Sequence, residues 1–143
     1  MPLSPASADH RPRVLAVDDE PTNLQVLRQV LGADYRLLFA TDGTRALQIA
    51  RQQQPELILL DVMMPGMNGQ TFMQERKNDP RILNIQVVII TADDTTEQQV
   101  LTMELGASDY IVKPFIPEIV TRRVQNVWDS TRRKKEVLQE HQK

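Results

Sequence analysis

Five polar side chains stand at the ends of four short apolar runs, and together they could hold a metal ion beside a reactive carboxylate. The positions are Asp18, Asp19, Asp61, Thr91 and Lys113. In an open parallel sheet the carboxyl ends of the strands form one edge, where ligands bind. Neighbouring carboxylates repel each other unless a cation neutralises them. The spacing therefore predicts a divalent-metal site in which one aspartate reacts.

The apolar runs are predicted to be buried strands, and the amphipathic stretches between them are predicted to be helices. Five strand–helix units indicate a flavodoxin-like α/β fold, which is a doubly wound parallel sheet in the order 2-1-3-4-5 with an extended C-terminal helix. The predicted strands cover residues 13–17, 35–40, 57–60, 87–90 and 110–112. The predicted helices begin at Pro21, at a cap formed by Thr41 or Asp42, at Gly69, near Thr95 and at Pro117.

Composition removes several classes of site. The 143 residues suffice for one domain. A disordered lead-in is expected over 1–12, the domain over 13–127 and a helical linker or tail over 128–143. Cysteine is absent, and the two histidines lie in the polar ends of the chain. Disulfides, thiolate metal sites, cysteine catalysis and histidine-based sites are therefore not expected. A net charge of -2 argues against general nucleic-acid binding. No apolar run reaches the roughly 20 residues of a membrane span, and a cytoplasmic location is expected.

The site residues belong to longer motifs that occur in a fixed order. They are Val-Asp18-Asp19-Glu20-Pro, Leu-Leu-Asp61-Val-Met-Met-Pro-Gly-Met-Asn-Gly69, Ile-Ile-Thr91-Ala and Tyr110-Ile-Val-Lys113-Pro-Phe. In this order and at this spacing they resemble the receiver domain of two-component response regulators, over roughly residues 13–127. The resemblance implies phosphorelay signal transduction, in which the domain is a switch and not an enzyme in the ordinary sense. Its only catalysis would be phosphotransfer onto itself and autodephosphorylation.

The resemblance also assigns roles. Asp61 becomes the phosphoacceptor, and Mg²⁺, or Mn²⁺ in its place, is held by Asp18, Asp19, Asp61 and the backbone carbonyl of Met63. Lys113, in a cis bond to Pro114, contacts the phosphoryl oxygens, and Thr91 gives its hydroxyl to them. Tyr110 is the switch aromatic that turns inward when Thr91 moves. Each residue also has an ordinary structural role, such as a helix-end acid, a strand terminus or a half-buried aromatic.

The implied partners are a sensor histidine kinase or a phosphotransfer protein, and an output domain or target. The last helix resembles the linker to a cyclic-di-GMP enzyme or a histidine-kinase module. A homodimer could form through Trp128 and a stripe of the last helix, or through the face of the fourth helix and fifth strand. Direct contact with nucleic acid or membrane is not expected. The stripe is Val120, Val124, Val127, Thr131, Lys134 and Leu138.

Two alternatives stay open at this point. Haloacid-dehalogenase-like phosphatases also use a strand-end aspartate with Mg²⁺, but they carry a second acid two residues later, where this chain has Met63. The second alternative is an interaction module that is never phosphorylated, but it does not explain why Asp18, Asp19 and Asp61 occur together. Within the receiver interpretation, Met63 and Asp93 are predicted to tune the lifetime of the acyl phosphate.

Overall fold

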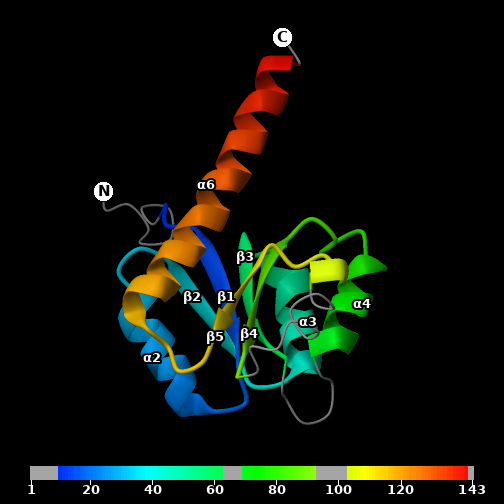
Figure 1. Cartoon of the computed structure of the whole chain (residues 1–143). Coiled ribbons are helices and arrows are strands. Elements are labelled where there is room, and N and C mark those ends of the chain that lie inside the picture. Colours follow the sequence, from blue (N-terminus) through cyan, green and yellow to red (C-terminus); the bar gives the residue numbers. More distant parts are fainter. Residues whose placement is uncertain (1–9, 63–68, 93–102, 142–143) are drawn as a thin grey trace, which may run out of the picture.

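The fold is built around a central five-stranded sheet. The computed structural model describes residues 10–62, 69–92 and 103–141, with side chains as far as Ser130. The five strands pair in parallel in the order β2-β1-β3-β4-β5, as predicted (Figure 1). Their bounds are β1 (Arg13–Val17), β2 (Arg36–Ala40), β3 (Leu57–Asp61), β4 (Gln86–Thr91) and β5 (Asp109–Val112).

Helices cover both faces of this sheet, which confirms the flavodoxin-like fold (Figure 1). Parallel neighbours require crossover connections, and the helices supply them. The helical bounds are α2 (Pro21–Leu31), α3 (Gly43–Gln53), α4 (Gly69–Lys77) and α6 (Pro117–His141). The helix predicted over about residues 95–105 lies mostly outside the described residues. No helix in the described ranges is both long and apolar enough to cross a membrane.

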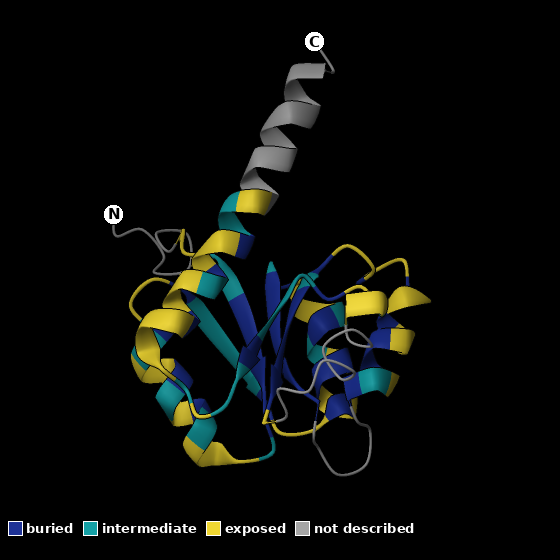
Figure 2. Ribbon diagram, viewed as in Figure 1, coloured by how far each residue is buried: buried dark blue, intermediate teal, exposed yellow. Residues whose placement is uncertain are grey.

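Successive strand residues feed two separate cores, because their side chains point to opposite faces. The three central strands are buried and the two edge strands partly so, and the helices bury the sides that face the sheet (Figure 2). On one face the core combines strand residues with α3 and α4, through Ala46, Leu47, Ala50, Phe72 and Met73. On the other it combines strand residues with α2 and α6, through Leu24, Leu27, Leu31, Val120, Val124 and Val127.

Local signals at the helix ends act as the sequence indicated. Of the two candidate caps for α3, Asp42 is the one used, and its Oδ1 accepts a hydrogen bond from the Arg45 amide at 2.7 Å. Gly69 opens α4 directly against Val62. A Cβ on Gly69 would lie 2.7 Å from the Val62 Cα, so close backbone approach is the reason for glycine there.

The last helix corrects one prediction. Val120 and Val124 are fully buried, and Val127 nearly so, against α2 and the sheet. These three residues of the proposed dimer stripe are therefore core residues, and a dimer seam cannot include them. Beyond them α6 continues away from the sheet to His141 (Figure 1).

Candidate functional site

Three aspartates meet at the carboxyl edge of the sheet. Asp18 and Asp19 directly follow β1, and Asp61 is the last residue of β3. Each contributes a carboxylate oxygen that lies within 4.8 Å of those of the other two. Carboxylate oxygens are the ligands that Mg²⁺ prefers, and it is usually held by one or two of them with several waters retained. The donor set therefore fits this ion.

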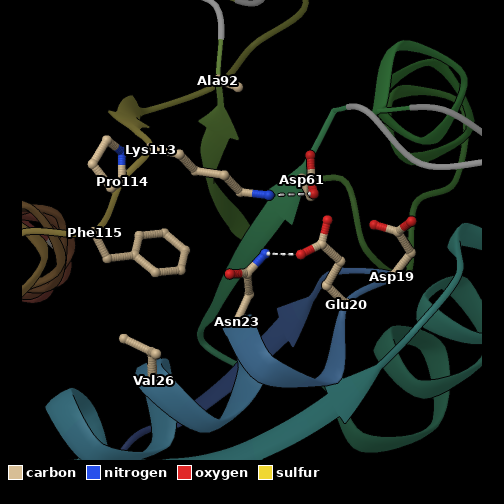
Figure 3. Close-up of a pocket in the computed structure, with 9 residues that line it drawn as sticks. All are labelled: Asp19, Glu20, Asn23, Val26, Asp61, Ala92, Lys113, Pro114 and Phe115. Atoms are coloured by element: carbon tan, nitrogen blue, oxygen red, sulfur yellow. Dashed lines mark hydrogen bonds and ion pairs between the residues drawn. The ribbon is translucent and has the colours of Figure 1, made fainter.

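Lys113 brings a positive charge to this group of acids from the end of β5. Its Nζ lies 2.9 Å from Asp61 Oδ2 (Figure 3). The same Nζ lies 3.2 Å from Asp18 Oδ2. Burial alone would lower the pKa of Lys113, but the hydrogen bond and charge of Asp61, with those of Asp18, raise it above its ordinary value. The lysine is therefore held charged against the two aspartates. The Lys113–Pro114 bond is cis, as the resemblance implied.

Asp18 is completely buried, yet both of its oxygens have donors. Oδ1 accepts the Glu20 amide at 2.9 Å, and Oδ2 accepts Asn23 Nδ2 at 3.1 Å. Sequence reasoning missed Asn23. The available signal was a short amide side chain within the first turn of the helix that follows an acidic pair.

Thr91 lies at the same edge as the last residue of β4. It is 2% exposed, and its carbonyl accepts the Lys113 amide at 2.8 Å. Asp61 pairs in register with Ile90, which directly precedes Thr91 in β4. The sheet thus places Thr91 between the strand that ends in Asp61 and the strand that leads to Lys113.

A cavity of about 720 Å³ opens beside Asp19, Asp61 and Lys113. Its polar wall combines acids, the lysine and an amide, while its other wall is apolar (Figure 3). Phe115 is partly buried against the core of α2 and α6 and also lines the cavity. The lining residues are Asp19, Glu20, Asn23, Val26, Asp61, Ala92, Lys113, Pro114 and Phe115.

Tyr110 stands three residues before Lys113 and is half-buried. The Arg123 guanidinium lies 5.1 Å from the centroid of its ring, within cation–π range. Asp109 Oδ1 accepts Arg123 Nη1 at 2.8 Å and holds the guanidinium in place. Tyr110 is therefore in contact with α6. Met63 and Asp93 lie outside the described residues.

Another buried carboxylate, Asp79, follows α4 and lies away from this site. Two arginines bind it, with Arg51 Nε at 2.8 Å from Oδ2 and Arg81 Nη2 at 3.0 Å. The Arg81 amide also donates to Oδ1, at 2.9 Å. The hydrogen bonds from Arg81, followed by that from Arg51, hold the pKa of Asp79 far below its usual range.

Known response regulators resemble this chain in sequence. PleD of Caulobacter vibrioides, a response regulator, is 41% identical over 80% of this chain and 26% of its own length. MtrA of Mycolicibacterium smegmatis, a DNA-binding response regulator, is 39% identical over 80% of this chain and 50% of its own length. The chain thus spans a quarter to a half of these relatives.

A solved structure agrees with this pattern. The receiver domain of the sensor histidine kinase PA1611 from Pseudomonas aeruginosa holds a magnesium ion in its active-site cleft. It superimposes with a TM-score of 0.74 at 26% identity, over 81% of this chain and 96% of its own. The family profile described as the response regulator receiver domain matches residues 14–125. The chain therefore belongs to the receiver domain family of response regulators.

Proposed function

We propose that Asp61 accepts a phosphoryl group from a partner histidine kinase, a phosphotransfer protein or a small phosphodonor. The observation that carries this proposal is the placement of Asp61 beside Lys113 Nζ, at 2.9 Å, within an open cavity that also holds Asp19. A carboxylate is a recognised nucleophile for such intermediates. The bond from phosphorus to an Asp61 oxygen forms as the bond from phosphorus to the donor breaks.

Asp18, Asp19 and Asp61 would hold Mg²⁺, or Mn²⁺ in its place, together with the backbone carbonyl of Met63. Support comes from the proximity of the three carboxylates and from the magnesium ion bound by the PA1611 receiver domain. When bound, the ion supplies positive charge that stabilises the transferring phosphoryl group. The residues themselves present oxygen ligands from two adjacent strands.

Lys113 and Thr91 would act on the phosphoryl oxygens. Lys113 carries a point charge that attracts the incoming anion and compensates its charge after transfer. Thr91 stands at the end of the strand between β3 and β5, from which its hydroxyl would bind the phosphoryl group. The backbone contact of Thr91 with Lys113 links the two groups.

Tyr110 would report the phosphorylated state at the surface. A phosphoryl group adds about two negative charges and strong acceptors, and Thr91 moving toward it would leave space for the Tyr110 ring. Because Arg123 packs on that ring, the change would reach α6. An ordered two-state element of this kind is what a phosphorylation switch requires.

The whole protein's output is a separate proposal. Since the matched relatives are two to four times longer than the matched region, we propose that this domain controls a further domain or a separate target. The domain itself would be no enzyme beyond its own phosphorylation and dephosphorylation, and would act in the cytoplasm without contacting nucleic acid. A homodimer through the outer part of α6, or through the β5 face, also belongs to this proposal.

The haloacid-dehalogenase-like phosphatase is not favoured, because the family match and Met63 both argue against it.

The decisive experiment is incubation of the chain with Mg²⁺ and acetyl phosphate, followed by intact-mass measurement. We expect one added phosphoryl group, its loss in Asp61→Asn, and its retention in Asp34→Asn, an exposed control. Uptake by Asp61→Asn equal to that of the wild type would overturn the assignment.

A further inference from the structure

We propose that Asn23 is a positioning residue that holds the Asp18 carboxylate in the orientation needed for cation binding. The inference deepens the proposed function and rests on it. Asn23 lies in the first turn of α2, and its side chain reaches the wall of the cavity (Figure 3). Its Nδ2 lies 3.1 Å from Asp18 Oδ2 and 3.4 Å from Glu20 Oε2.

The helix sets the direction of this amide. The Asn23 backbone amide donates to the Glu20 carbonyl at 3.0 Å, which fixes Asn23 on the first turn. The Glu20 amide in turn donates to Asp18 Oδ1 at 2.9 Å. Asp18 is thus bound through one oxygen by the helix backbone and through the other by Asn23. Rotation of its carboxylate would break both hydrogen bonds.

The donors on this side of Asp18 are neutral, and this distinguishes them from Lys113. An amide satisfies a buried carboxylate oxygen without cancelling its charge. Lys113 Nζ, 3.2 Å from the same Oδ2, does compensate the charge. Asn23 therefore keeps Asp18 ordered while leaving its negative charge available to a cation. Groups that orient metal ligands in this way commonly govern metal affinity.

The test is a calorimetric Mg²⁺ titration of the full chain without any phosphodonor. For Asn23→Ala we expect affinity roughly tenfold weaker, the order seen when an outer partner of a metal ligand is lost. Asn23→Leu removes the same donor while keeping the number and branching of the side-chain heavy atoms, and is expected to weaken binding equally. Alanine favours helix more than asparagine, so α2 should form in the first variant. Gln25→Ala, an exposed amide on the same helix, is the matched control.

A second readout separates positioning from a merely structural role. In acetyl phosphate reactions, Asn23→Ala should raise the Mg²⁺ concentration needed for half-maximal phosphorylation by the same factor, while the rate at saturating Mg²⁺ stays near wild type. Unchanged Mg²⁺ affinity in either Asn23 variant, or an equal loss in Gln25→Ala, would overturn the proposal. Because the titration needs no phosphoryl transfer, its failure is distinguishable from failure of Asp61 to be phosphorylated.

Discussion

Asp61 and Asp79 are both buried aspartates bound by cations, yet their surroundings differ in the balance of charge. At Asp79 one carboxylate meets two arginines and a backbone amide. At Asp61 three carboxylates lie close together, and among the described residues Lys113 forms ion pairs with two of them, Asp61 and Asp18. Within the described part of the chain, the arginines compensate the charge of Asp79, whereas the three carboxylates near Asp61 carry more negative charge than Lys113 supplies. Burial of a carboxylate is thus uninformative about function until its counter-charges are counted.

The two clusters also occupy opposite edges of the sheet. Asp61 ends β3, at the carboxyl edge where ligands bind in open α/β sheets. Asp79 precedes β4, and Arg51 lies in the last turn of α3 before β3 begins. Its ion pairs therefore join α3 to the connection between α4 and β4. The ion pairs of Asp79 therefore connect elements at one edge of the sheet, whereas the proposed phosphoryl transfer to Asp61 would take place at the opposite edge.

The largest predicted effect is a double dissociation between the two aspartates. Asp61→Asn should abolish phosphoryl uptake and remove most of the rise in melting temperature that Mg²⁺ produces, because one of the three carboxylate ligands is lost. Asp79→Asn should lower the melting temperature with or without Mg²⁺, while the Mg²⁺-induced rise and the uptake persist. Thermal unfolding and intact mass would measure both. If Asp79→Asn loses the Mg²⁺ response, the clusters are not independent.

The next effect concerns Lys113, which forms ion pairs with Asp61 and Asp18. Lys113→Ala should bind Mg²⁺ several times more tightly than wild type, since it removes a cation that competes for Asp61 and Asp18, and should also be phosphorylated more slowly. Arg51→Ala, which removes a cation from the Asp79 cluster, should leave Mg²⁺ affinity unchanged. Calorimetry gives the affinities. Weaker Mg²⁺ binding by Lys113→Ala would contradict competition between the lysine and the ion.

The pH dependence of Asp79 is expected to be smaller and to lie in the acid range. Its pKa is depressed in the folded chain, so its stabilising contribution is complete above the unfolded pKa of about 4 and is lost as pH falls below it. The difference in melting temperature between wild type and Asp79→Asn should stay constant from neutral pH down to about 5, then shrink. A difference that grows as the pH falls would show that the sign is wrong.

The smallest effect distinguishes the two arginines that bind Asp79. Arg51 is 30% exposed and Arg81 is 64% exposed, and exposed ion pairs contribute little. The backbone hydrogen bond from Arg81 also survives truncation of its side chain. Arg81→Ala should therefore lower the melting temperature less than Arg51→Ala. The reverse order in thermal unfolding would refute this ranking.

Much of the fold and the site was predictable, because the relevant signals are local. Strands buried in a parallel sheet appear as continuous apolar runs, as the runs before Asp18, Asp61 and Thr91 do. The run before Lys113 is shorter and only partly buried, but it too ends directly before a site residue. The strand count and crossover rules then bring their carboxyl ends to one edge. Asp42 and Gly69 mark helix starts through requirements of their own backbone positions.

The contacts that only the tertiary structure decided depend on how layers pack. Their apolar periodicity made Val120, Val124 and Val127 candidates for a dimer seam. In the folded chain these three residues pack against α2 and the sheet and belong to the core. The ion pairs of Asp79 have no local signal in the sequence, because its arginines come from α3 and from the residues beyond Asp79.

The sequence by itself determined which residues end strands and which helix faces are apolar, since these follow from the repeat of each element. The tertiary structure decided which charges compensate each other. That outcome depends on distances of a few ångströms between segments far apart in the chain, and no local pattern encodes them. Lys113 and Asp61, 52 positions apart, are joined by a 2.9 Å hydrogen bond that exists only because β5 and β3 flank β4 in the folded sheet.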